Sequence, residues 1–189
     1  MPEDSGSLFR RIAGNPDKLK EAGEALFTLA ASSPEIFATQ LRGMDPTTGE
    51  PFSFGRRGWE FQLDLLSWWE DNPKTIILKA RQIGITWLAG ARCLHYLLFR
   101  PGSRSLIVSI SESEAAKVVN RIWDMLASCP EHLRQHVVIL KPQRGRPSTI
   151  IEVAHPGGAI SSILGLPSTP AAGHGETAAF VVLDEFARQ

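Results

Sequence analysis

The chain has 189 residues, of which 43% are hydrophobic, and its 20 basic and 20 acidic side chains give it no formal net charge. This length allows one domain with a substantial apolar core, and the zero net charge excludes a uniformly basic surface, so any nucleic-acid-binding surface must be local. Two cysteines, no run long enough to span a membrane and a polar N-terminus without an apolar secretory segment predict a soluble, intracellular protein.

The N-terminal part of the chain predicts helices followed by a linker. Residues 17–31 carry apolar side chains at helical spacing, and residues 33–41 predict a second short helix. Residues 43–58 are rich in Gly, Pro and Thr and predict a loop. We therefore expect residues 1–50 to form an N-terminal helical segment with a linker, and residues 51–189 to form the main domain.

Residues 59–70 predict a helix with an apolar stripe that we expect to face the core: Phe61, Leu65, Trp68 and Trp69. The same helix contains Gln62, whose amide offers an acceptor and two donors that suit the N6/N7 edge of adenine. On its own pattern, however, Gln62 is expected on the solvent face of the helix.

Residues 75–99 predict a strand, a compact basic loop and a helix. Residues 75–78 are a β-branched apolar run that predicts a buried strand, and residues 87–99 have helical spacing. This order suits phosphate, because the N–H groups of the loop and the positive end of the helix point at the anion together. Thr86, in the first helical turn, can place its hydroxyl on the Mg²⁺ that accompanies a nucleotide.

The loop departs from the standard phosphate-binding pattern G-x-x-x-x-G-K-[ST]. Gly84 and Thr86 stand where the second Gly and the hydroxyl belong, but Ile85 occupies the position of the lysine. Positive charge comes earlier in the loop, as Lys79 and Arg81. The loop alone therefore supports phosphate binding and an ordinary strand–turn–helix equally.

A second strand–helix unit follows the loop. Residues 105–110 predict a buried strand and residues 111–127 a helix, with Ser111 as its capping residue. Residues 149–153 and 159–164 flank a Gly-rich turn and predict a hairpin. Alternating strands and helices predict a mainly parallel sheet, to which an antiparallel hairpin can be added.

Two other patterns have competing interpretations. Residues 141–147 form a basic loop broken by prolines, which could grip a DNA backbone or simply be solvated. Cys129, His132 and His136 have ligand-like spacing, but a structural zinc site normally has four ligands. We therefore favour surface residues at a helix end over a zinc site.

Residues 180–183 predict a buried strand that ends in Asp184 and Glu185. In parallel α/β sheets, ligands collect at the carboxyl ends of strands. One carboxylate there can bind Mg²⁺, and the other can orient or deprotonate water. Together with the phosphate loop, this pattern favours a metal and a general base over a strand that merely reaches solvent.

These motifs resemble those of viral terminase large subunits, the motors that package double-stranded DNA into capsids. Residues 79–86 resemble the deviant phosphate loop (Walker A) of that family, whose basic residue often comes at its start. Residues 181–185 resemble its Walker B strand, and residues 61–66 resemble its upstream segment with an adenine-reading glutamine. The resemblance implies an α/β fold of the P-loop NTPase (RecA/ASCE-like) type. We expect a three-layer sandwich with a mostly parallel sheet, incomplete at the C-terminus.

The resemblance also implies ATP and Mg²⁺ as cofactors and gives the site residues their roles. Thr86 and Asp184 would hold Mg²⁺, and Glu185 would activate water. Lys79 or Arg81 would supply charge, so Lys79→Ala and Arg81→Ala should each weaken ATP binding, whereas Ile85→Ala should matter little. The implied nucleotide-binding set is Gln62, Lys79, Ala80, Arg81, Gln82, Ile83, Gly84, Ile85 and Thr86.

For the whole motor, the resemblance implies double-stranded DNA, a portal protein and a small terminase subunit as partners of a homo-oligomeric ring in the host cytoplasm. Terminases often carry an arginine in a loop comparable to residues 167–177, but this chain has His174 there, which is a poor substitute for a guanidinium. The resemblance further implies more strands, a coupling motif and a nuclease domain after Gln189, so we expect an N-terminal fragment.

Two alternatives stay open. The first is another P-loop enzyme, such as a helicase-like or remodelling ATPase, because such enzymes also have an Asp-Glu at a strand end and an upstream glutamine. The second is a non-catalytic nucleotide-binding fragment, which Ile85 at the position of the lysine permits.

Overall fold

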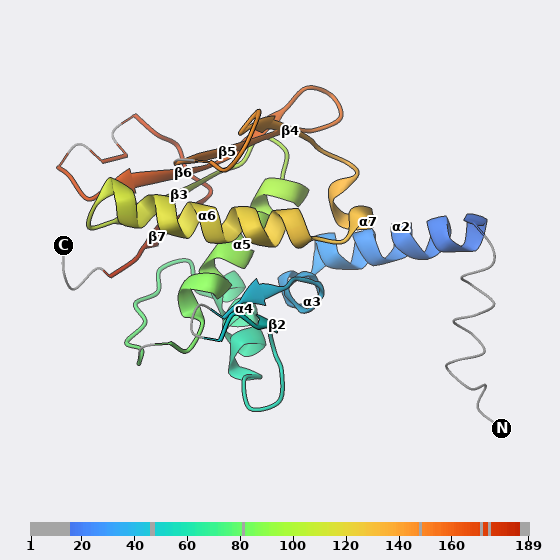
Figure 1. Cartoon of the computed structure of the whole chain (residues 1–189), viewed down its shortest axis with the longest axis horizontal. Coiled ribbons are helices and arrows are strands. Elements are labelled where there is room, and N and C mark those ends of the chain that lie inside the picture. The colour runs from blue at the N-terminus through green and yellow to red at the C-terminus, as the bar shows by residue number, and fades with distance from the viewer. Residues whose placement is uncertain are drawn as a thin grey trace.

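The computed structural model describes residues 16–45, 48–80, 82–147, 149–170, 172–173 and 175–185. Its centre is a five-stranded sheet with the strand order β4-β5-β6-β3-β7 (Figure 1). The strands β6, β3 and β7 pair in parallel, and β5 is antiparallel to both β6 and β4. Within this sheet, therefore, β5 runs against the other four strands, and the predicted α/β class with a mostly parallel sheet is confirmed. The strands are β3 (Arg104–Ser109), β4 (Val138–Lys141), β5 (Ile150–Ala154), β6 (Ile160–Pro167) and β7 (Phe180–Leu183).

Helices α3 (Pro34–Gln40) and α6 (Glu112–Ser128) begin where the local sequence signals predict, whereas α4 begins at Phe61 rather than at residue 59 and α5 at Ile85 rather than at residue 87. The Ser33 hydroxyl accepts the N–H of Ile36 at 3.1 Å at the start of α3, and the Ser111 hydroxyl accepts the N–H of Glu114 at 3.2 Å at the start of α6. These bonds satisfy backbone donors that a first helical turn leaves without partners. The described helices are α2 (Pro16–Ser32), α3 (Pro34–Gln40), α4 (Phe61–Asp71), α5 (Ile85–Phe99), α6 (Glu112–Ser128) and α7 (Glu131–Arg134). A small antiparallel ribbon, β1 (Gly43–Met44) with β2 (Pro51–Phe52), lies within the predicted linker.

Helices α5 and α6 cover the same face of the sheet. Phe180 of β7 lies level with Ser105 of β3 and stacks on Tyr96 of α5, with ring centroids 5.7 Å apart. Gly165 of β6 lies level with Ile107 and packs against α6. Ser105 and Ile107 are two residues apart in β3 and so share one face. The described residues therefore form the sheet and a helical layer on one of its faces.

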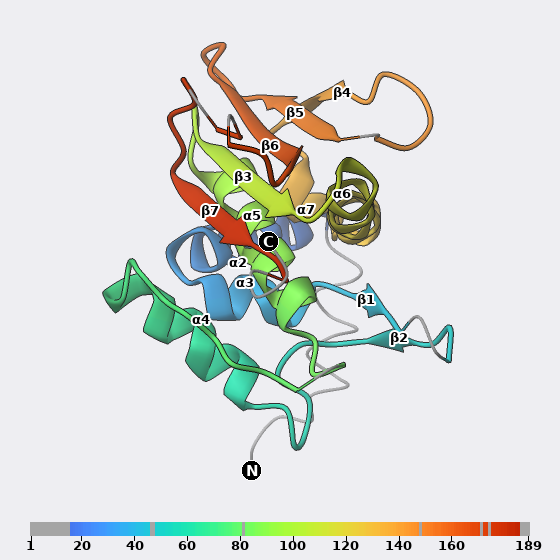
Figure 2. The ribbon, with the colours of Figure 1, turned by 90° about the vertical axis from the view of Figure 1, so that its left-hand side faces the viewer.

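The predicted buried strand at residues 75–78 is wrong. These residues have no regular secondary structure, and the side chains of Ile76 and Leu78 are 94% and 102% exposed. Figure 2 shows this segment between the end of α4 and the start of α5, outside the sheet. The run has the composition of a buried strand, but a strand forms only where a neighbouring strand completes its hydrogen bonds. No strand among the described residues pairs with it.

Helix α4 turns a different face to the core from the one predicted. Phe61 and Trp68 are 40% and 47% exposed, whereas Gln62 and Leu66 are 2% and 1% exposed. The predicted stripe is therefore wrong for Phe61 and Trp68, and so is the expected solvent position of Gln62. Helical spacing alone could not exclude the amide from the buried face, because a polar group is tolerated there when backbone partners satisfy it.

His95 joins α5 to α2. Its Nε2 lies 3.1 Å from the carbonyl oxygen of Ala30, and its ring packs beside Phe37 and Phe99. Burial, with the nearby Arg92 charge as a smaller contribution, lowers the pKa of His95 from 6.5 to about 4. The folded chain therefore holds His95 in its neutral form at neutral pH. No helix among the described residues is long and apolar enough to cross a lipid bilayer.

The lowered pKa of His95 predicts a pH-dependent stability. Between pH 6.5 and 4 the unfolded chain binds this proton more tightly than the folded chain, so the free energy of unfolding falls as the pH is lowered. The expected loss attributable to His95 between pH 7 and 4.5 is about 2 kcal/mol. Urea unfolding at both pH values should show a correspondingly smaller decrease for His95→Gln. The matched substitution His136→Gln controls for the chemical change, and equal losses in the wild type and His95→Gln would contradict the prediction.

Candidate functional site

The end of β7 lies against the start of α5, as Figure 2 shows. The Thr86 hydroxyl donates to the Asp184 carboxylate at 3.2 Å, and the backbone N–H of Asp184 donates to the carbonyl of Val108 at 2.9 Å. The second bond continues the pairing of β7 with β3 by one residue, so the sheet itself positions the carboxylate. The structure therefore brings together the two residues predicted to bind a metal. A hydroxyl and a carboxylate are oxygen donors of the kind Mg²⁺ prefers, and they leave room for the waters that this ion retains.

Glu185 follows directly and has an unusual backbone conformation. Its φ is 53°, in the left-handed region that few residues other than glycine adopt. The residue is exposed and lies just beyond the strand, where the chain turns away from the sheet. Such conformations are concentrated at functional sites, where the surrounding structure holds them. The predicted general base is thus placed next to the predicted metal ligand Asp184, on solvent-accessible chain.

The phosphate loop enters α5 through a left-handed glycine. Gly84 has a φ of 75°, and its carbonyl accepts the N–H of Leu88 at 2.9 Å, which begins the hydrogen bonds of α5. Gln82 also has a positive φ, of 63°. A Cβ on Gly84 would lie 2.6 Å from Nε2 of Gln62. Gly84 is therefore required both for its conformation and for the close approach of Gln62.

The side chains of the loop separate into exposed and buried groups. Lys79, Ala80 and Gln82 are exposed, whereas Ile85 is only 7% exposed and belongs to the apolar core. Ile85 therefore packs the domain and does not substitute chemically for a lysine. Arg81 lies outside the described residues, so among the described loop residues the positive charge comes from Lys79.

Gln62 joins two segments at the site. Its Oε1 accepts the N–H of Gly55 at 3.3 Å, and its Nε2 donates to the carbonyl of Ile83 at 3.4 Å. The helical pattern had suggested exposure, because it does not show the two backbone partners that the amide finds outside α4.

Trp59 is a neighbour of the loop that sequence reasoning missed. A Cβ on Gly84 would lie 3.8 Å from the Trp59 ring, and the guanidinium of Arg56 lies 4.9 Å from the centroid of that ring. This distance is within the range of a cation–π interaction. The sequence pattern placed Trp59 in the predicted helix of residues 59–70 but outside its apolar stripe, and Arg56 in the predicted loop of residues 43–58. An arginine three residues before a tryptophan was the signal that could have paired them.

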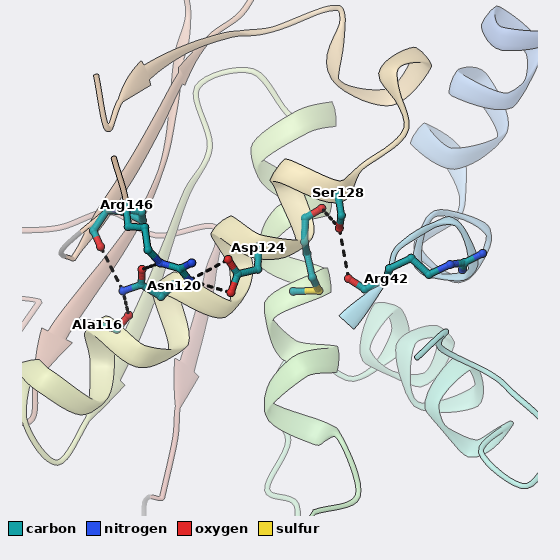
Figure 3. Close-up of polar contacts among 8 residues, drawn as sticks. Arg42, Ala116, Asn120, Asp124, Ser128 and Arg146 are labelled. Atoms are coloured by element: carbon teal, nitrogen blue, oxygen red, sulfur yellow. Dashed lines mark hydrogen bonds and ion pairs between the residues drawn. The ribbon is translucent and has the colours of Figure 1, made fainter. Parts of the chain in front are cut away.

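The basic loop between β4 and β5 contacts helix α6 through Arg146. Figure 3 shows Arg146 lying over α6, where it donates to Oδ1 of Asn120 at 2.9 Å and pairs with the carboxylate of Asp124 at 2.8 Å. Asn120 in turn donates to the carbonyls of Ala116 and Pro147. Arg146 thus anchors the loop on the helix, and both interpretations of residues 141–147, contact with a DNA backbone and a solvated loop, stay untested.

Cys129, His132 and His136 have separate surroundings. Burial raises the pKa of the Cys129 thiol to about 12, and His132 contacts the side-chain oxygen of Gln40 at 2.8 Å. The ring of His136 packs on Phe27 with centroids 4.1 Å apart. Within the described ranges, no group of three or more His, Cys, Asp or Glu residues could hold a metal ion. His174 lies outside the described residues.

Comparisons with known proteins relate the chain to one family. A family model described as "Terminase large subunit, T4likevirus-type, N-terminal" matches residues 76–188. The structure is similar to the large terminase of bacteriophage HK97, with 18% sequence identity and a TM-score of 0.55 over 84% of this chain and 33% of that chain. It is also similar to the large terminase ATPase domain of Thermus phage P74-26, with 26% identity and a TM-score of 0.44 over 56% of this chain and 45% of that chain. This chain thus spans less than half the length of each of these two solved terminase chains. A search of curated proteins finds no match.

Proposed function

Since this chain belongs to the family of T4-like terminase large subunits, in its N-terminal region, we propose that it is the ATPase portion of a DNA-packaging motor. The fold shared with the HK97 large terminase is consistent with this assignment. The observation that carries the proposal is the contact of the Thr86 hydroxyl with the Asp184 carboxylate. A hydroxyl that follows a phosphate loop and a carboxylate at a strand end are the two protein ligands of Mg²⁺ in P-loop ATPases.

In this proposal the start of α5 receives the phosphates of ATP. The first N–H groups of a helix have no partners within the helix and lie at its positive end, so the main chain of residues 81–86 attracts an anion. Lys79 and Arg81 supply the positive charge that Ile85 lacks. In this proposal the charge comes from the beginning of the loop rather than from its end.

The chemistry is shared between the hydroxyl and the two carboxylates. Thr86 and Asp184 would hold Mg²⁺, and the bound ion would supply positive charge against the phosphate oxygens. Glu185 orients a water molecule toward the terminal phosphate and takes its proton. We propose adenine recognition by Gln62 from the family resemblance alone, because in this structure its amide is 2% exposed and contacts the backbone of Gly55 and Ile83.

We propose the partners from family membership alone. They are double-stranded DNA, a portal protein and a small terminase subunit. These would bind a ring formed by copies of the large subunit in the host cytoplasm. The match covers less than half of either solved relative, so we propose translocation for the whole motor and not for this chain alone.

The affinity of the chain for ATP tests the proposed site. Isothermal titration calorimetry should detect binding of MgATP to the wild type, and Lys79→Ala should weaken it about tenfold, the value of one charge-assisted hydrogen bond. Lys20→Ala, an exposed lysine of α2, is the matched control and should bind as the wild type does. No binding to the wild type at millimolar ATP would favour a non-catalytic fragment instead.

A further inference from the structure

One buried amide connects the phosphate loop to the segment before α4. Gln62 is 2% exposed and contacts the backbone of Gly55 on one side and of Ile83 on the other. Twenty-one residues of chain separate Gln62 from Ile83, so this bond is a tertiary contact rather than part of a helix. The amide is also the group that approaches the vacant Cβ position of Gly84.

The contact determines which way the loop's peptide groups point. A trans peptide is planar, so the carbonyl of Ile83 and the N–H of Gly84 point in opposite directions. Because Gln62 holds the carbonyl on the side of α4, the N–H of Gly84 faces away from α4. Gly84 has left-handed φ and no side chain, and nothing in its own geometry would otherwise resist rotation of this peptide.

We propose that Gln62 is a positioning residue that orients the phosphate loop for its anion, in addition to any contact it makes with the base. The inference rests on the proposed ATP site and extends it: Gln62 acts through the Ile83–Gly84 peptide on the phosphate end of the nucleotide. Gly55, on the other side of the amide, also has a left-handed φ of 66° and closely packs against Leu63, so the second anchor of the amide is itself held in place.

A ligand without a base separates this role from adenine recognition. The probes are MgATP and the magnesium complex of inorganic tripolyphosphate, titrated into the 189-residue chain. Gln62→Met has nearly the same length and removes both hydrogen bonds. Gln62→Glu keeps the acceptor for Gly55 and removes the donor to Ile83, where the new carboxylate repels the carbonyl oxygen.

If Gln62 positions the loop, both substitutions lower the binding affinity for MgATP and for magnesium tripolyphosphate by the same factor, about tenfold for the lost hydrogen bonds. Hydrogen exchange without nucleotide should also become faster at Leu88, whose N–H donates to the carbonyl of Gly84, while α6 is unchanged, in variants whose circular dichroism melts show a folded chain. If Gln62→Met does not fold, Gln62→Glu decides. Gln135→Met, at an exposed glutamine, is the matched control.

A lower affinity for MgATP with an unchanged affinity for tripolyphosphate would overturn the positioning role and leave Gln62 as a residue that recognises the adenine base. Unchanged exchange at Leu88 in a folded variant would overturn it as well. If the wild type binds neither probe, the ATP site itself is refuted, which is a different result from either of these.

Discussion

Glu185→Gln is expected to reduce ATP hydrolysis by about 10²–10⁴-fold, the usual contribution of a positioned general base, while MgATP still binds. The substitution removes the proton acceptor and keeps the size of the side chain. Asp184 and Thr86, which carry the proposed metal contacts, are unchanged. Glu185 is exposed at the end of β7, so its replacement should not disturb the core.

Single-turnover hydrolysis of radiolabelled ATP at saturating MgATP measures the first effect, and calorimetry measures the second. Glu176→Gln is a suitable control, because Glu176 is a carboxylate engaged in an ion pair with Arg104. Hydrolysis at the wild-type rate, or loss of MgATP binding by a folded Glu185→Gln chain, would remove Glu185 from the proposed role.

Asp184→Asn is expected to remove most of the dependence of ATP binding on magnesium. The amide keeps an oxygen that can accept from Thr86, and the backbone bond to Val108 is unaffected, so the local fold should persist. The substitution takes away the negative charge that attracts the ion. Changes in the groups that merely orient metal ligands cost about 10–100-fold in metal affinity, so loss of a direct ligand should reach about 100-fold.

Titration of ATP with and without Mg²⁺ measures this effect. The wild type should bind ATP more tightly with the ion, whereas Asp184→Asn should show nearly equal affinities. Asp124→Asn is the control, because the Asp124 carboxylate pairs with Arg146 and is not part of the proposed metal site, and this variant should behave as the wild type does. An undiminished magnesium effect in Asp184→Asn would place the metal elsewhere.

Local patterns in the sequence were sufficient for most of the regular elements. The helices α5 and α6, the hairpin of β5 and β6, and the strand β7 all follow from hydrophobic periodicity, capping residues and turn residues, which act between near neighbours in the chain. For the same reason Gly84, Thr86, Asp184 and Glu185 could be selected in advance, because each occupies a recognisable position relative to a strand or helix end.

The tertiary structure decided what depends on distant neighbours. Residues 75–78 have the composition of a buried strand, but no described strand pairs with them, and Ile76 and Leu78 are exposed. Gln62 looked like a surface residue, and its burial depends on the backbone of Gly55 and Ile83.

The sequence by itself determined that a compact basic loop precedes a helix and that an acidic pair follows a strand. Only the folded chain decided that Thr86 and Asp184 touch, that Ile85 packs in the core, and that Gln62 joins the loop to α4. The physical reason is one of range. Propensities and caps act over a few residues, whereas Thr86 and Asp184 are 98 positions apart in the chain and form one site only after the sheet and its helices have packed.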